Sequence, residues 1–323
     1  MIDTYGRVID YLRVSITDRC NLRCGYCMPD DLPFIPHSDI LRYEEILRIC
    51  TLMANNGVKT FRVTGGEPLA RRGCIDFIRE LQAIPGVENV SLTTNAVLLA
   101  PYIETLASIG LRSLNISLDS VNPETYYMIT GQNLFSRVWN TIEAAIESGI
   151  PTKINCVPLG GINDMELLSL VKLAEVYPIQ VRFIEMMPTT VNGAFQGIPS
   201  EQILLILQNE YPDLEVDETK YGFGPAHYYK SKRFMGRVGM IDAISNHFCT
   251  SCNRLRLTSE GFLKLCLYHD DGLDLRLLLR EGCSDEEINT AIISKVLDKP
   301  QRHHFDIKPN GKDGIKKMSR IGG

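Results

Sequence analysis

Three cysteines near the N-terminus restrict the fold and the chemistry of this chain more than any other feature of its sequence. Cys20, Cys24 and Cys27 follow a C-x3-C-x2-C spacing within residues 18–29, which read DRCNLRCGYCMP. Thiolates this close together can bind one metal centre from a single loop. An Fe–S cube normally takes four thiolates, so three predict a cluster with one iron open to another ligand. Tyr26, directly before the last cysteine, is placed to cover that open site.

Two other interpretations of this loop are weaker. Structural zinc takes four Cys or His ligands, usually in paired C-x2-C knuckles. The nearest histidine, His37, lies in a Pro-rich segment and is poorly spaced to complete such a site. A disulfide is disfavoured by the expected compartment. The N-terminal residues contain no long apolar run, so we expect neither a signal peptide nor a membrane anchor. In a cytoplasmic protein, ten cysteines indicate metal or redox use rather than disulfides.

Size and charge set wider limits. A chain of 323 residues suits one large domain with a smaller one. Its net charge of −5 provides no general attraction to nucleic acid or to an anionic membrane, so phosphate binding has to be local. No stretch reaches the roughly 18 apolar residues that span a bilayer. We expect a cytoplasmic protein without nucleic-acid or membrane partners.

Strand and helix patterns alternate along the first two thirds of the chain and predict a parallel α/β fold. The expected strands are residues 11–16, 58–63, 89–94, 111–118, 153–157 and 180–184. The expected helices include residues 43–55, 75–83, 101–109, 165–177 and, after the last of these strands, 201–209. In a barrel of such units the catalytic groups gather at the C-terminal ends of the strands.

Polar and glycine-rich residues do follow these strands. Residues 64–68 read TGGEP, and glycines there allow close approach to the backbone. Alone, a GGEP segment is a weak signal and most often a turn. The other polar strand ends are Thr93, Asn95, Asn115, Ser117, Asp119, Lys153, Asn155 and Glu185. Cys50, Cys74 and Cys156 are interpreted as packing residues.

A second cysteine group lies near the C-terminus. Cys249, Cys252 and Cys266 again provide three thiols, and we favour an auxiliary Fe–S cluster with an open iron. The flanking His247 and His269 keep zinc binding open as an alternative. A fourth thiol, Cys283, is better explained by packing. Between the cysteines, Arg254 and Arg256 are two apart on an expected strand, so they project from one face as a fork for phosphates or carboxylates.

The first loop, with its aromatic before the last cysteine and the GGEP segment, resembles the radical S-adenosylmethionine (SAM) superfamily. That resemblance implies a partial (β/α)6 TIM-type barrel, open on one side, with a smaller C-terminal region carrying the second cluster. It implies that three thiolates hold a [4Fe–4S] cluster whose fourth iron chelates SAM. One electron then cleaves SAM to methionine and a 5′-deoxyadenosyl radical. The expected domains are residues 1–220 and 221–323.

More specifically, three segments resemble the GTP 3′,8-cyclases of molybdenum cofactor biosynthesis. They are residues 11–29 (YLRVSITDRCNLRCGYCMP), 252–258 (CNRLRLT) and 318–323 (MSRIGG), so the resemblance covers essentially the whole chain. It implies conversion of GTP to (8S)-3′,8-cyclo-7,8-dihydroguanosine 5′-triphosphate, the first step towards molybdopterin. The implied partners are an electron donor and, downstream, cyclic pyranopterin monophosphate synthase.

The same resemblance implies a role for each matching residue. The ligands of two [4Fe–4S] clusters are Cys20, Cys24, Cys27 for the SAM cluster and Cys249, Cys252, Cys266 for the auxiliary one. The residues lining SAM are Tyr26, Gly66, Ser117 and Met187. The residues contacting GTP are Arg13, Arg62, Thr93, Lys153, Arg254 and Arg256. The glycines Gly322 and Gly323 reach the active site and assist catalysis.

The chain departs from the family pattern at two positions, with Ala96 where Gly is commoner and Gly73 where an acidic residue is commoner. Two other functions remain in view. A different radical SAM enzyme with an auxiliary cluster, such as a peptide-modifying one, is disfavoured by the arginine fork and the Gly-Gly end. A non-catalytic Fe–S or zinc protein that binds RNA is disfavoured by the acidic net charge. The sequence leaves the oligomeric state open, a homodimer included.

Overall fold

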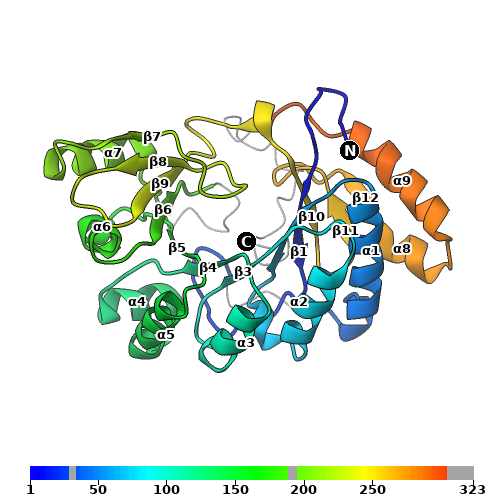
Figure 1. Ribbon diagram of the computed structural model, residues 1–323, viewed down its shortest axis with the longest axis horizontal. Coiled ribbons are helices and arrows are strands. Elements are labelled where there is room, and N and C mark those ends of the chain that lie inside the picture. The colour runs from blue at the N-terminus through cyan, green and yellow to red at the C-terminus, as the bar shows by residue number, and fades with distance from the viewer. Residues whose placement is uncertain (29–33, 188–194, 304–323) are drawn as a thin grey trace. The chain divides into compact units, whose positions relative to one another are not determined.

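The computed structural model describes residues 1–28, 34–187 and 195–303. The chain divides into two compact units. Unit 1 comprises Met1–Asn21, Asp30–Thr93 and Cys249–Gly323, and unit 2 comprises Leu22–Pro29 and Thr94–Phe248. Both units combine strands with helices, and both contain a run of parallel strands (Figure 1).

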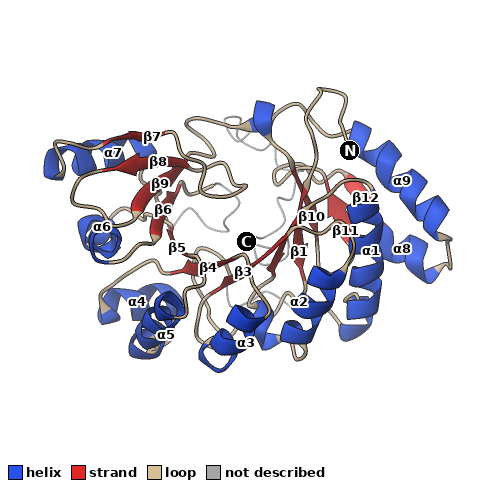
Figure 2. Cartoon of the chain, viewed as in Figure 1, coloured by secondary structure: helices blue, strands red, loops and turns tan. Residues whose placement is uncertain are grey.

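The strands of unit 1 follow the order β12-β11-β10-β1-β2-β3. They are β1 (Tyr11–Ser15), β2 (Thr60–Thr64), β3 (Asn89–Thr94), β10 (Arg254–Leu257), β11 (Phe262–Lys264) and β12 (Gly272–Asp274). The four strands from β10 to β3 run parallel, and β11 and β12 continue the sheet in antiparallel pairs. The helices, on one side of these strands in Figure 2, are α1 (Tyr43–Asn55), α2 (Cys74–Ala83), α8 (Leu275–Arg280) and α9 (Asp285–Leu297).

The strands of unit 2 follow the order β4-β5-β6-β9-β8-β7. They are β4 (Ser113–Ser117), β5 (Thr152–Cys156), β6 (Gln180–Ile184), β7 (Glu215–Asp217), β8 (His227–Lys230) and β9 (Arg237–Ile241). Again the first four in this order are parallel and the last two pairs are antiparallel. The helices are α3 (Ile103–Ser108), α4 (Pro123–Thr130), α5 (Phe135–Glu147), α6 (Leu167–Val176) and α7 (Ser200–Glu210).

Alternating side chains explain why the parallel strands are stable. In β1, Leu12 and Val14 are fully buried while Arg13 between them is half-buried. β2 repeats the pattern with Phe61 and Val63 on either side of Arg62. Successive side chains of a strand point to opposite faces, so each strand buries an apolar face against its helices and leaves arginines on the other.

The structure confirms the α/β class with parallel strands. The expected bounds of β3, β6 and α1 agree with the observed ones. The expected helix 101–109 is instead a 3-10 turn, Ala100–Tyr102, followed by α3, because Pro101 fixes the start of the turn. Cys50, Cys74 and Cys156 are core residues as predicted, at 0, 3 and 0% exposure.

The pairing partners of β9 and β10 were not anticipated. They were expected in a separate region, yet β9 pairs in parallel with β6 in unit 2, and β10 pairs in parallel with β1 in unit 1. Each lies far along the chain from its partner, and local sequence patterns carry no information on such pairing. The expected boundary at residue 220 stays a prediction.

The two departures from the family pattern lie at left-handed backbone positions. Gly73 caps the start of α2 with φ at +83°, a conformation that favours glycine. Ala96 has φ at +64° and is the one non-glycine residue with positive φ in the described ranges. Glycine at this position would relieve backbone strain, which agrees with the glycine that the family resemblance implies there.

No helix in the described part of the chain is both long and apolar enough to cross a bilayer.

Candidate active site

The GGEP segment lies against the backbone that leads into the first cysteine loop. Gly66 N donates to the carbonyl oxygen of Thr17 over 2.8 Å, and Glu67 N donates to that of Arg19 over 2.8 Å. A Cβ on Gly66 would lie 2.4 Å from the Arg19 carbonyl oxygen. From the sequence we expected this glycine to allow a ligand to approach the backbone. In the structure its missing side chain allows the main chain at Arg19, the residue before Cys20, to pack against it.

Within unit 2, the aromatic residue of the cysteine loop is fixed by a buried carboxylate. Tyr26 Oη donates to Asp119 Oδ2 over 2.6 Å, and Asp119 Oδ1 accepts from Val157 N over 2.8 Å. Burial and the neighbouring Asp119 charge raise the pKa of Tyr26 well above its ordinary value. Burial also raises the pKa of Asp119, although both hydrogen bonds oppose it. The Tyr26 side chain is therefore tied to the ends of β4 and β5.

The residues expected around SAM include Ser117, the last residue of β4. Ser117 pairs in register with Asn155 of β5, which in turn pairs with Arg182 of β6. Arg182 is 3% exposed and donates to Asn155 Oδ1 over 2.8 Å and to Asn115 Oδ1 over 2.7 Å. This buried arginine links β4, β5 and β6. Met187, half-buried, follows β6 by three residues.

Three of the arginines expected to contact GTP form one row across unit 1. Arg13 of β1 is in register with Arg256 of β10 on one side and Arg62 of β2 on the other. Residues paired in this way project from the same face of a sheet. Arg254 is two residues before Arg256, so it lies on that face as well. The sequence predicted only the pair on β10 as a geometric unit.

These guanidinium groups repel one another. Loss of hydration, followed by the charges of Arg256 and Arg62, holds the pKa of Arg13 well below its ordinary value. Loss of hydration and the charge of Arg254 lower the pKa of Arg256 to about 10. Arginine stays protonated at neutral pH, so the lowered pKa values reflect the cost of burying these charges, to which their mutual repulsion adds. An anion with several charges would relieve it.

The two remaining residues expected at GTP are not members of this row. Thr93, in β3, has a buried Oγ1 without a hydrogen-bond partner among the described residues, so it is available to a ligand. Lys153, in β5 of unit 2, is buried, and its Nζ donates to the carbonyl oxygen of Tyr221. Contact of either residue with GTP stays a prediction.

The second cysteine motif lies beside the arginine row in unit 1. Cys249 begins a 3-10 turn, Cys249–Ser251, and Cys252 N donates back to the Cys249 carbonyl oxygen over 3.2 Å. Arg254 Nη2 lies 4.0 Å from Cys252 Sγ. Burial raises the pKa of Cys252, but the charges of Arg254 and Lys299 outweigh it and bring the pKa to about 7. Cys252 is therefore substantially ionised at neutral pH, as a metal ligand requires.

The chemistry of the donor set, three thiols in each motif, is that of Fe–S cluster ligands. All six motif cysteines are free and half-buried, as is Cys283, whereas Cys50, Cys74 and Cys156 are free and buried in the core. Among the described residues, His, Cys, Asp and Glu form no group of three or more arranged around a single metal ion. His247 is exposed, and His269 is hydrogen-bonded to the Arg302 carbonyl oxygen.

Comparison with known proteins places the chain in a class. Residues 14–174 match the model of the radical SAM superfamily, and residues 179–305 match that of Molybdenum Cofactor Synthesis C. The crystal structure of Streptococcus suis SuiB bound to S-adenosylmethionine is similar, with a TM-score of 0.59. The match covers 83% of this chain and 63% of that chain at 14% identity, and so shows the fold alone. The chain is a radical SAM protein.

Its curated relatives narrow the class further. The GTP 3′,8-cyclase of Clostridium perfringens (strain SM101 / Type A) is 42% identical over 324 residues, and that of Petrotoga mobilis is 44% identical over 337. Both alignments cover all of this chain and all of the relative. The chain belongs to the GTP 3′,8-cyclase family.

Several site residues were not singled out from the sequence. Asp119 and Asn155 were noticed only as polar strand ends, and Arg182 and Lys299 were not noticed. An arginine inside an otherwise apolar strand could have identified Arg182, because a buried charge needs polar partners. Gly322 and Gly323 lie outside the described residues.

Gly66→Ala tests the close approach at the cysteine loop. The added methyl group cannot fit 2.4 Å from a main-chain oxygen, so β2 and the loop must separate. We expect the midpoint of thermal unfolding to fall by several degrees, in line with overpacking costs of roughly 1–3 kcal/mol, and iron loading at the first loop to fall with it. Gly224→Ala is the matched control, because a Cβ at Gly224 meets no atom within 4 Å. Equal unfolding midpoints in the two variants would contradict the packing described.

Proposed function

We propose that this chain binds GTP and joins C3′ of its ribose to C8 of its guanine, giving the 3′,8-cyclised triphosphate in the first step of molybdenum cofactor biosynthesis. The observation that carries the proposal is the row Arg256–Arg13–Arg62, with Cys252 of the second cysteine motif two residues before the start of β10. A triphosphate-binding array beside an Fe–S motif suits a radical SAM enzyme whose relatives are named GTP 3′,8-cyclase.

Two [4Fe–4S] clusters are part of the proposal. Cys20, Cys24 and Cys27 would hold the first, and Cys249, Cys252 and Cys266 the second. When bound, the first cluster and SAM supply the one-electron chemistry that starts the reaction. Tyr26, Gly66, Ser117 and Met187 would line SAM. In this assignment Asp119 keeps the Tyr26 ring in place, because its buried carboxylate accepts the hydrogen bond from the Tyr26 hydroxyl.

The arginines would bind the triphosphate. Arg presents a planar fork that matches phosphate oxygens, and its charge-assisted hydrogen bonds are stronger than neutral ones. Arg13, Arg62, Arg254 and Arg256 are held on adjacent strands, so little ordering is needed when GTP binds. Thr93 and Lys153 would complete the contacts. The second cluster, next to Arg254, would then face the guanine end.

The remaining assignments concern the enzyme's surroundings. We propose that an electron donor reduces the first cluster and that cyclic pyranopterin monophosphate synthase consumes the product. We propose further that the enzyme works in the cytoplasm, as a monomer or a homodimer. A peptide-modifying activity is the alternative function. The similarity to SuiB supports only a shared fold, whereas full-length relatives at 42–44% identity support the cyclase.

Metal content and turnover test the function together. Anaerobically reconstituted protein should contain about eight irons per chain, and Cys252→Ala about four. With SAM, a reductant and GTP, the native protein should form the cyclised nucleotide, and Cys252→Ala should cleave SAM without forming it. Zinc in place of iron at the second motif, or a modified peptide as the only product, would overturn the proposal.

Arg256→Met tests the arginine row. Charge-assisted bonds are worth roughly 1.5–3 kcal/mol each, so GTP affinity measured by calorimetry should fall roughly ten- to a hundred-fold. Stability without GTP should not fall with it, because the substitution removes repulsion from Arg254 and Arg13. Arg79→Met is the control, since Arg79 is half-exposed and pairs with Asp76. Unchanged GTP affinity in Arg256→Met would place the phosphates elsewhere.

Deletion of Gly322 and Gly323 tests their assignment. We expect both clusters and GTP affinity to be retained, and cyclised product in a single turnover to be nearly abolished, because glycine can enter a crowded site where larger residues clash. Product formation at the native level would mean that the two glycines are dispensable, and loss of iron would mean that they are structural.

A further inference from the structure

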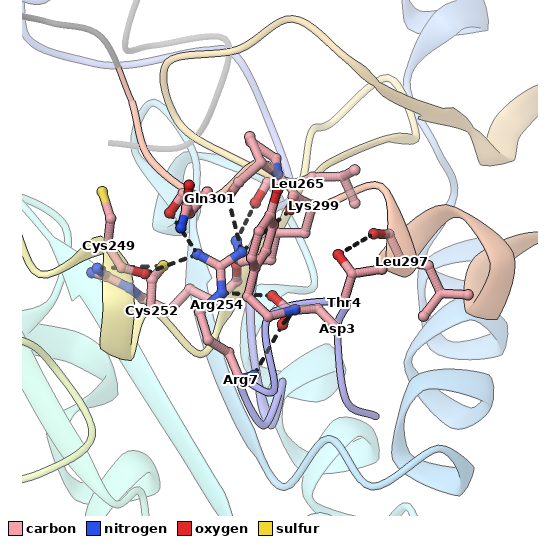
Figure 3. A network of polar contacts seen from close by, with 12 residues as sticks. Asp3, Thr4, Arg7, Cys249, Cys252, Arg254, Leu265, Leu297, Lys299 and Gln301 are labelled. Atoms are coloured by element: carbon pink, nitrogen blue, oxygen red, sulfur yellow. Dashed lines mark hydrogen bonds and ion pairs between the residues drawn. The ribbon is translucent and has the colours of Figure 1, made fainter.

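A buried arginine connects three segments of unit 1 at the second cysteine motif (Figure 3). Arg7 is 7% exposed, and its Nε donates to Asp3 Oδ2 over 2.6 Å. Nη1 donates to the carbonyl oxygens of Cys249 (2.8 Å) and Gln301 (3.1 Å). Nη2 donates to those of Lys299 (3.3 Å) and Pro300 (2.8 Å). All five N–H groups of the guanidinium thus have acceptors.

A second buried cation lies next to it. Lys299 is 2% exposed, and its Nζ donates to the carbonyl oxygen of Arg254 over 2.9 Å and to that of Leu265. Leu265 directly precedes Cys266, and Arg254 follows Cys252 by two residues. Lys299 therefore links the two stretches of main chain that carry these thiols, as Figure 3 shows. Arg7 likewise links the main chain at Cys249 to residues 299–301.

The two cations differ in what balances their charge. Arg7 pairs with the fully buried Asp3. Lys299 makes no ion pair with a carboxylate in the described ranges, and the groups that favour its charged form are the thiols of Cys252 and Cys266, which become negative when they ionise. A buried ammonium without a counter-ion is costly. The thiolates, and the anionic cluster that they would form, supply that counter-ion.

We propose that Lys299 is a positioning residue for the second cluster, holding the main chain at Cys266 and Arg254 while its charge stabilises the thiolate ligands and the reduced cluster. Arg7 completes the arrangement by holding the main chain at Cys249. This inference rests on the second cluster proposed above. It differs from the roles of the arginine row, because neither Arg7 nor Lys299 is assigned to GTP.

A charge at this place has a measurable effect. The potential of an Fe–S cluster depends on the net charge around it and on hydrogen bonding in its surroundings. A cluster with three thiolates gains negative charge on reduction, so a nearby ammonium favours the reduced state. Removing that ammonium should move the midpoint potential to more negative values. A residue that only packs would leave the potential unchanged.

The experiment isolates the second cluster in the full-length chain. Cys20, Cys24 and Cys27 are replaced by alanine, so that only the second motif loads iron. In this background the midpoint potential is titrated and followed by electron paramagnetic resonance, with iron counted per chain. Lys299→Met removes the charge at similar length, Lys299→Arg keeps it, and Lys59→Met is the control at an exposed lysine that pairs with Glu88.

We expect Lys299→Met to load less iron and to titrate at a more negative potential, and Lys299→Arg and Lys59→Met to stay near the parent. A Lys299→Met cluster at the parent potential would overturn the proposal, as would equal behaviour of Lys299→Met and Lys299→Arg. If Lys299→Met does not fold, Lys299→Gln provides the uncharged variant, and the same two outcomes apply to it.

Arg7→Lys tests whether the hydrogen bonds of the Arg7 guanidinium or its positive charge are what the second motif requires. It keeps one positive charge but has three donors in place of five, so we expect second-cluster iron to fall by more than half while the potential of the loaded fraction changes little. Iron loading at the parent level would overturn the role of Arg7. A parent protein that loads no iron at the second motif would refute the second cluster itself, which is a distinct result from an unaltered Lys299 variant.

Discussion

The parallel pairing of β1 with β10 is the interaction on which the candidate site depends most. It joins residues near the start of the chain to residues some 240 positions later, with Tyr11 opposite Arg254 and Arg13 opposite Arg256. Side chains along a strand alternate between the two faces of the sheet. A shift of this register by one residue would therefore place the arginines of β1 or those of β10 on the apolar face, in the core. The register therefore fixes the face that we propose binds phosphate. It also fixes the position of the second cysteine motif, because Asn253 alone separates Cys252 from β10.

Crowding of positive charge is the second organising feature. Four arginines on adjacent strands raise the free energy of the folded chain, and the lowered pKa values of Arg13 and Arg256 reflect the cost of burial together with mutual repulsion. The apolar faces of β1, β2 and β10 offset it, since Leu12, Phe61 and Leu255 are fully buried. The same logic applies at Lys299, where main-chain carbonyls and thiolates take the place of water. At the arginine row and at Lys299 the fold buries positive charge at a cost in free energy, and a bound anion would offset that cost.

The sequence was sufficient to predict those elements whose pattern depends on residues close together in the chain. Alternation of apolar residues located β3 and β6, and the apolar stripe of α1 located that helix, because these patterns depend on neighbours within a few residues. Spacing alone singled out the six motif cysteines and the fork of Arg254 and Arg256. Contacts between distant segments were not predictable. Nothing near Arg7 indicates that Cys249 is its acceptor, and nothing near Asp119 indicates Tyr26, since these partners are chosen by the packing of whole strands.

The way unit 1 is assembled has a consequence for its synthesis on the ribosome. The acceptors of Arg7 at Lys299, Pro300 and Gln301 emerge nearly three hundred residues after it, and β10 emerges long after β1. At roughly 5–20 residues per second, β1 waits on the order of ten to fifty seconds for that partner. Residues 94–248 of unit 2 form a continuous stretch and can fold in the meantime. The nascent chain thus carries an unpaired strand edge and an unsatisfied arginine until its last segments appear, and during that interval the edge is open to pairing with another chain.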